Sequence, residues 1–338
     1  MYLKDNIQLF RSFTFNRIFN VFKLYLSFIL SRITKKSFVL GSPFALSIEP
    51  TTTCNLGCPE CPSGLRQFTR KTGNLTPEIN KKIIDELKSN LTYINYYFQG
   101  EPYINRHLFE MIKYANQNNI YCSTSTNGHF LTDKNCKKTI ESGLKRLIIS
   151  IDGVDQKSYE NYRINGDFSK VIAGTKNIIK WKEKLNSQTP HIIFQFLVVK
   201  TNEHLIDEIK ALSKSLKINE LRLKTAQLYE FKKGNPLMPT NDQYSRYKLN
   251  EDGEYELKNK LYNHCWRMWS SAVVTVNGEI VPCCFDKDAV NKIGNLHTEK
   301  FKTIWNSRSY NKFRTLILKD RNDIEICKNC SEGSKVWA

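Results

Sequence analysis

The stretch TTTCNLGCPECPSG, residues 51–64, decides how the rest of the sequence is interpreted. It holds three of the chain's ten cysteines at a C-x3-C-x2-C spacing: Cys54, Cys58 and Cys61. Such positions would share one face of a helix, but Gly57 and Pro59 both oppose a continuous helix here. The stretch is therefore predicted to be a loop that turns three thiols toward a common centre.

Three thiols so close together suit few kinds of site. Structural zinc normally takes four protein ligands, and a single disulfide would leave one cysteine over. A cubane iron–sulfur cluster held by three thiolates keeps its fourth iron open for another ligand. The spacing favours such a cluster, with zinc bound by a remote fourth ligand and simple packing of the cysteines as the alternatives.

At these residues the sequence resembles the radical S-adenosylmethionine (radical SAM) enzymes, whose signature is this triad just after the first strand of the barrel. The resemblance implies that Cys54, Cys58 and Cys61 are the catalytic and metal-binding residues, holding a [4Fe–4S] cluster whose open iron chelates SAM. An electron from the cluster then splits the sulfonium, giving methionine and a 5′-deoxyadenosyl radical that abstracts hydrogen. Members of the family often have an aromatic residue just before the last cysteine, where Glu60 stands here.

From residue 43 onward, short apolar strands alternate with helical segments, a pattern that indicates βα units around a parallel sheet. Strands are expected at residues 44–50, 93–99, 120–126, 146–152, 191–199 and 220–225. Helical periodicity lies between them, as at residues 77–90 and 204–216. The predicted fold is α/β, a partial (β/α)6 TIM-like barrel, in which chemistry gathers at the C-terminal ends of the strands.

Further resemblance to the family lies at three strand ends. FQGEP after the second strand is similar to the GGE-type motif, whose backbone and acidic residue hold the SAM amino group. STSTNG at the third resembles the segment near the ribose and methionine, while IISIDG ends the fourth; alone, an Asp-Gly there usually indicates only a turn. Arg163 is the candidate for the SAM carboxylate. The resemblance thus implies these SAM-binding residues: Gly100, Glu101, Pro102, Ser125, Asn127, Ser150, Asp152 and Arg163.

A second set of cysteines lies near the C-terminus. Asn277-Gly278 between two apolar runs predicts a hairpin, and a helical segment at 300–318 precedes the motif CKNC. The pattern C-x12-G-x4-C followed by C-x2-C resembles the shortened SPASM module, also called twitch, which binds one auxiliary [4Fe–4S] cluster; structural zinc is the alternative. The implied ligands are Cys265, Cys283, Cys327 and Cys330, with the spare Cys284 able to replace Cys283.

Composition limits the class of protein. With 51 basic and 33 acidic residues, the net charge of +18 indicates either an anionic partner or an ordinary basic surface. No nucleic-acid-binding motif is visible. Cysteines at ligand-like spacings in a chain of 338 residues do not form a secreted disulfide framework, which favours a cytoplasmic location. Cys122 and Cys136 are predicted to be small core residues.

Residues 1–36 are a separate basic, amphipathic segment with seven basic residues and one acidic. Apolar residues recur at steps of three and four: Phe19, Phe22, Leu26, Ile29, Leu30 and Ile33. The apolar run is too short to span a bilayer, and no signal-peptide cleavage site follows it. The segment is predicted to be a helix that either contacts an anionic membrane peripherally, at its inner face, or packs on the barrel.

The predicted domains are a basic N-terminal segment (1–40), a radical SAM core (41–226), a linker (227–262) and a small α+β SPASM/twitch domain (263–338). The resemblance implies an enzyme that abstracts hydrogen from an unidentified small molecule or peptide, giving a net oxidation assisted by the auxiliary cluster. An external donor such as a flavodoxin or ferredoxin would supply electrons. A peptide- or protein-modifying maturase is the first alternative and RNA modification the next. A non-catalytic metal-binding protein that docks an anionic partner is the alternative from another class.

Overall fold

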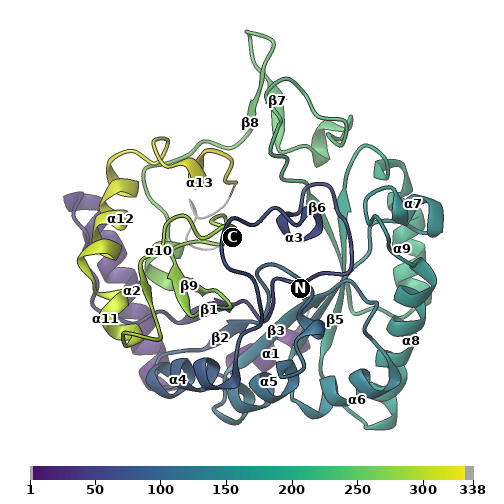
Figure 1. Ribbon diagram of the computed structural model, residues 1–338, viewed down its shortest axis with the longest axis horizontal. Helices are drawn as coiled ribbons and strands as arrows, with labels where there is room; N and C mark the ends of the chain where they lie inside the picture. The colour runs from purple at the N-terminus through teal and green to yellow at the C-terminus, as the bar shows by residue number, and fades with distance from the viewer. Residues whose placement is uncertain (1–2, 332–338) are drawn as a thin grey trace. The chain divides into compact units, whose positions relative to one another are not determined.

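Six strands and the helices between them follow the order expected from the sequence, as the computed structural model shows (Figure 1). Each strand begins within one residue of its predicted start: β1 (Ala45–Ile48), β2 (Tyr93–Asn95), β3 (Tyr121–Thr126), β4 (Arg146–Ser150), β5 (His191–Val198) and β6 (Glu220–Thr225). Helices separate them: α4 (Pro77–Leu87), α5 (Leu108–Gln117), α6 (Asp133–Glu141), α8 (Phe168–Lys184) and α9 (Ile206–Ser215). Strands β1 to β3 pair in parallel, as do β4 to β6. The predicted α/β class is confirmed.

The structure describes residues 3–331, which fall into two units assembled from separate segments of the chain. The first unit comprises Met1–Asp5, Cys54–Gln67 and Thr124–Lys260, and so includes the cysteine loop. The second comprises Asn6–Thr53, Phe68–Ser123 and Leu261–Ala338, with the second cysteine set. In the second unit the strands follow the order β11-β10-β9-β1-β2, and then the first half of β3; the added strands are β9 (Ser271–Val274), β10 (Glu279–Val281) and β11 (Gly294–Asn295).

The C-terminal part of the second unit begins with the predicted hairpin. Strands β9 and β10 pair antiparallel, and Gly278 has a φ of 70°, a left-handed conformation that favours glycine. The helical stretch at 300–318 is two helices, α11 (Phe301–Trp305) and α12 (Arg308–Lys319), because Ser307 caps the second by accepting from the Tyr310 N–H at 3.2 Å. Short helices α10 (Arg267–Ser270) and α13 (Glu325–Lys328) flank the hairpin and α12 in the chain.

The stretch predicted as a linker, 227–262, is folded within the first unit, except for its last two residues. It contains an antiparallel pair, β7 (Tyr247–Leu249) and β8 (Tyr255–Leu257). Tyr247 is buried and stacks on Phe231, with 4.4 Å between ring centroids. Residues 227–262 therefore contribute side chains to the core of the first unit.

A buried ion pair fixes the end of β1, where the chain leaves for the cysteine loop. The carboxylate of Glu49 accepts from the guanidinium of Arg70 at 2.6 and 2.8 Å, and both side chains are almost fully buried. Glu49 also accepts from the Val276 N–H of the β9–β10 hairpin at 3.1 Å. Because an unpaired buried carboxylate is costly, this pair ties β1 to the hairpin beside it.

The N-terminal segment forms two helices, α1 (Leu3–Phe10) and α2 (Phe15–Thr34). One side of helix α2 is buried within the second unit, with two apolar and four polar side chains: Leu24, Phe28, Arg17, Asn20, Ser27 and Ser31. Arg17 donates five hydrogen bonds to the carbonyls of Ser12, Lys88, Asn118 and Asn119. No helix in the described part of the chain is long and apolar enough to cross a membrane.

Replacing Arg17 by methionine should lower the free energy of unfolding by about 3 kcal/mol, because buried carbonyls lose a charged donor. The matched control is Arg11→Met, since Arg11 is exposed. Urea unfolding of both variants beside the wild type measures the difference. Equal stabilities of the two variants would show that the docking of α2 does not depend on Arg17.

Candidate functional site

The cysteine loop in the first unit curls tightly behind Cys58. The Cys61 N–H donates to the Cys58 carbonyl at 3.2 Å, and the short helix α3 (Pro62–Leu65) begins directly after Cys61. A Cβ on Gly64 would lie only 2.6 Å from the Cys58 nitrogen, closer than real side chains allow. The loop can therefore close only with glycine at position 64.

The three thiols of the loop border one apolar cluster of the first unit. Cys58 is buried in it, and Cys54 and Cys61 pack against it half-buried. Its other buried members are Leu56, Tyr162, Val199, Ala226, Leu228, Met238 and Tyr247. The thiols thus share surroundings that penalise an uncompensated charge.

Arg163 supplies the positive charge at this place. Its Nε donates to Asp152 at 2.5 Å, and its Nη1 lies 3.8 Å from the sulfur of Cys58. Burial raises the pKa of Cys58, and the charge of Arg163 opposes that shift. Burial would lower the pKa of Arg163, but Asp152 and Cys58 raise it well above its usual value. The guanidinium is thus held between a carboxylate and a cysteine of the loop.

Asp152 is itself completely buried at the end of β4. Burial raises the pKa of its carboxyl, while Arg163 and the Leu197 N–H, which donates to it at 2.7 Å, lower that pKa. The buried Ser150 ends the same strand. Asp152 therefore orients Arg163, a role that the sequence did not reveal.

Asn127 is the second predicted residue that reaches the loop. Its side-chain amide donates to the Asn55 side chain at 2.8 Å and lies 3.9 Å from the sulfur of Cys54. Ser125, two residues earlier in β3, is half-buried. The structure thus brings Asn127, Asp152 and Arg163 to the cysteine loop, directly or through one another.

The predicted Gly-Glu-Pro motif belongs to the second unit. Gly100 has a φ of 71°, and a Cβ there would lie 2.3 Å from the Thr51 carbonyl oxygen. The Glu101 N–H donates to the carbonyl of Thr53 at 2.8 Å, so the motif packs along the residues that precede Cys54 in the chain. Pro102 follows in a single 3-10 turn, and the buried Glu101 carboxylate accepts from the Tyr103 N–H at 3.2 Å.

Glu60, which directly precedes Cys61, links the cysteine loop to a later segment of the first unit. Its carboxylate accepts from the Tyr229 N–H at 3.0 Å and from the Asn235 side chain at 3.2 Å. Burial, Cys61 and Glu60 together raise the pKa of Tyr229 to about 12. No sequence motif indicates these contacts, since 169 residues separate Glu60 from Tyr229.

The second cysteine set also gathers around a buried arginine. Arg321 lies with Nη2 3.2 Å from the sulfur of Cys330, and Nη1 donates to the His264 carbonyl at 3.3 Å. Burial raises the pKa of Cys327, whereas a hydrogen bond and the charge of Arg321 lower it and Cys265 raises it. Arg321 thus serves the same electrostatic purpose here as Arg163 in the first unit, and no spacing rule pointed to it.

The two adjacent cysteines of the hairpin differ in their surroundings. A hydrogen bond with Cys284, burial and the charge of Cys265 raise the pKa of Cys283. Cys284 instead packs against an apolar cluster of Val273, Val281 and Ala289. Cys283 thus interacts with both Cys284 and Cys265.

Both cysteine sets are all-thiol, the donor chemistry that iron–sulfur clusters take from proteins. Among the described residues, no three or more His, Cys, Asp or Glu side chains stand close enough to hold one metal ion.

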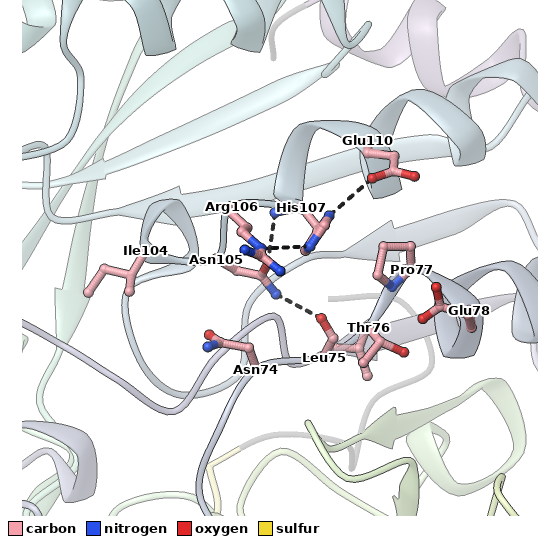
Figure 2. A pocket seen from close by; sticks show the side chains of 10 residues that line it. All are labelled: Asn74, Leu75, Thr76, Pro77, Glu78, Ile104, Asn105, Arg106, His107 and Glu110. Atoms are coloured by element: carbon pink, nitrogen blue, oxygen red, sulfur yellow. Dashed lines mark hydrogen bonds and ion pairs between the residues drawn. The ribbon is translucent and has the colours of Figure 1, made fainter.

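A cavity of about 710 Å³ opens at the starts of α4 and α5 (Figure 2), where Arg106, His107 and Glu110 form a chain of contacts of 2.9 and 3.1 Å. None of the predicted site residues lines this cavity.

Comparison with known families identifies the class. A sequence model of the Radical SAM superfamily matches residues 48–187, and together with a second match it covers more than half of the chain. The chain belongs to the radical SAM superfamily. The second match, over residues 265–331, is the SPASM iron–sulfur cluster-binding domain. This radical SAM protein is thus an enzyme whose cofactors are iron–sulfur clusters and SAM, as predicted.

Its relatives differ in what they act on. The PqqA peptide cyclase of Bradyrhizobium diazoefficiens is 25% identical, over 88% of this chain and 81% of its own. The SAM-dependent 2-deoxy-scyllo-inosamine dehydrogenase of Niallia circulans is 21% identical, over 86% and 93%. The SuiB structure of Streptococcus suis bound to SAM has a TM-score of 0.62 at 15% identity, over 88% of this chain and 74% of that one. This likeness confirms the partial barrel with a small C-terminal domain.

Removing the Arg163 side chain should leave Asp152 buried without its cation. The Arg163→Met variant is expected to lose about 3–5 kcal/mol of stability. Adding Asp152→Asn should restore most of that loss, because a neutral amide oxygen can still accept from the Leu197 N–H. Urea unfolding, with iron content determined alongside, measures both effects. An Arg163→Met variant as stable as the wild type would contradict this account of the pair.

Proposed function

We propose that Cys54, Cys58 and Cys61 hold a [4Fe–4S] cluster with one open iron, to which SAM binds. The observation that carries this proposal is a set of three thiols in one apolar environment without a fourth. Cys136, the other cysteine of the first unit, sits on α6 with its thiol 3.4 Å from the Leu131 carbonyl. Three protein thiolates leave a cluster iron available for another ligand.

The residues around the loop have distinct parts in this proposal. Arg163 compensates the negative charge of the thiolates, and Asp152 holds its guanidinium in place. Arg163 has five N–H donors in total, so after Asp152 and Cys58 it retains donors for the SAM carboxylate. Asn127 orients the Cys54 side of the loop. Ser125 and Ser150 complete the proposed SAM-binding set of the first unit.

The reaction that this site supports best is hydrogen abstraction followed by net oxidation. When bound, the first cluster supplies the electron that cleaves SAM to methionine and a 5′-deoxyadenosyl radical. The substrate gives a hydrogen atom to that radical, then loses one electron and one proton to become product. Cys265, Cys283, Cys327 and Cys330 would hold the second cluster; with four protein ligands and no open iron, it would supply an acceptor for the substrate's electron. An external flavodoxin or ferredoxin donates to the first cluster.

Three relatives support two different kinds of substrate. The dehydrogenase supports oxidation of a small molecule, since this chain covers 93% of it. The peptide cyclase and the mycofactocin maturase of Mycolicibacterium smegmatis, 28% identical over 54% of this chain, support a peptide. Peptide modification is therefore the second candidate. A short open reading frame beside the gene, encoding a peptide that this enzyme modifies, would decide for it.

Replacing all three loop cysteines by alanine should lower bound iron from about eight to about four per chain and abolish 5′-deoxyadenosine formation. Anaerobic reconstitution, iron analysis and incubation with SAM and a reductant give both measurements. The matched control is Cys136→Ala, which should keep both clusters. Formation of 5′-deoxyadenosine by the triple variant would show that these three cysteines do not hold the cluster that cleaves SAM.

The Cys327→Ala/Cys330→Ala variant should lose the second cluster yet still form 5′-deoxyadenosine. Without an acceptor for the second electron, it should release little or no product from the true substrate. Circular dichroism must first show that the variant is folded, because cluster binding and folding are linked. Cys284→Ala is the control and should behave as wild type. Product formation at the wild-type rate would make the second cluster structural only.

A further inference from the structure

Helix α2 turns its apolar side outward. The side chains of Phe15, Phe22 and Ile33 are 82%, 60% and 73% exposed. Other exposed members of the same helix face are Ile18, Phe19, Tyr25, Leu26 and Leu30. Of the twenty large apolar side chains exposed in the described residues, twelve lie between positions 7 and 40. A surface helix of a folded domain normally shows the opposite arrangement.

The opposite side of α2 is the one buried against the protein, through Leu24, Phe28 and four polar side chains. The segment 38–42 runs back along the helix, where Ser31 and Ser27 accept from the N–H groups of Phe38 and Leu40, each at 2.9 Å. Asn20 exchanges two hydrogen bonds with Ser42, at 2.7 and 2.9 Å. Every buried polar side chain of α2 is thus satisfied by docking, while the apolar stripe, about 30 Å long by helix geometry, remains uncovered.

The charged residues around the apolar stripe of α2 are all positive. Between residues 6 and 48 the chain has six basic residues and no acidic one. Arg17 is buried, but the other five basic residues are exposed or half-buried: Arg11, Lys23, Arg32, Lys35 and Lys36. At about 100° per residue, Lys23 and Arg32 fall on opposite edges of the stripe. Their charged groups lie over aromatic rings, with the Lys23 ammonium 4.9 Å from the Phe19 centroid and the Arg32 guanidinium 5.5 Å from the Phe28 centroid.

We propose that α2 is an interfacial helix that binds this enzyme to an anionic lipid surface. An apolar stripe flanked by lysine and arginine lies in the plane of a membrane, with its aromatic and aliphatic side chains at the boundary between headgroups and acyl chains. The basic edges are then placed at the level of the lipid phosphates. Because the buried side of the helix stays docked, binding requires no unfolding of the second unit.

A second copy of the chain fits this face less well. Pairing two stripes face to face would bring the basic edges of both copies together, and this segment offers no acidic residue to compensate them. The net charge of +18 adds to that repulsion. An anionic lipid surface compensates the basic edges of the stripe as well as the net positive charge of the chain. We therefore infer that lipid, rather than a second copy of the chain, covers the stripe.

The experiment is co-sedimentation of the full-length, cluster-loaded enzyme with vesicles. Vesicles of phosphatidylcholine with about 30% phosphatidylglycerol are compared with pure phosphatidylcholine, at low salt and in about 0.5 M salt. The face variant is Phe15→Ser/Phe22→Ser/Ile33→Ser. The matched control is Leu249→Ser/Val290→Ser/Leu316→Ser, at positions that are 59%, 76% and 45% exposed elsewhere. All six substituted side chains are exposed, so both variants should fold, as circular dichroism checks.

The wild type and the control should bind anionic vesicles at least about tenfold more tightly than neutral ones, and salt should weaken that binding. The face variant should lose about tenfold or more in affinity, and Lys23→Gln/Lys35→Gln/Lys36→Gln should lose binding to anionic vesicles selectively. Failure of the wild type to bind at low salt would overturn the proposal. So would undiminished binding by the face variant, or a wild-type dimer that the face variant converts to monomer, which would assign the stripe to chain–chain contact.

Discussion

Negative charge on buried thiolates is the constraint on which both halves of this enzyme depend. Each unit meets it with one arginine: the half-buried Arg163 beside Cys58, and the buried Arg321 beside Cys327 and Cys330. Both guanidiniums are themselves held in place, Arg163 by Asp152 and Arg321 by the His264 carbonyl. A cation fixed at a thiol favours the thiolate, which is the form that ligates iron.

The two sites differ in their number of thiols, and this difference is the basis for the proposal that the first binds SAM and the second accepts an electron. The first has three, on a loop whose curl depends on Gly64. The second gathers four from distant parts of the chain, with Cys265 before α10, Cys283 after β10, and Cys327 and Cys330 at the C-terminal end. A three-thiol site can take SAM as a ligand, whereas a four-thiol site can only exchange electrons or support the fold.

Sequence patterns predicted the elements because those depend on local chemistry. Alternating apolar runs located all six barrel strands, and Asn277-Gly278 located the hairpin, since both signals come from neighbouring residues. The electrostatic partners were not predictable: 105 residues separate Arg163 from Cys58, and no motif encodes that contact. For α2 the sequence shows the periodic apolar residues, but periodicity alone does not determine which face of the helix packs against the rest of the protein. There the docked face combines Leu24 and Phe28 with polar side chains that find backbone partners.

The central claim is that SAM binds at the iron left open by Cys54, Cys58 and Cys61. Its most direct measurement is electron paramagnetic resonance of the reduced enzyme, titrated with SAM, in two forms that each retain one cluster. The account predicts that SAM shifts the signal of the form that keeps the loop cysteines and leaves the form that keeps only the C-terminal set unchanged. A SAM-dependent shift in the second form, or none in the first, would contradict it.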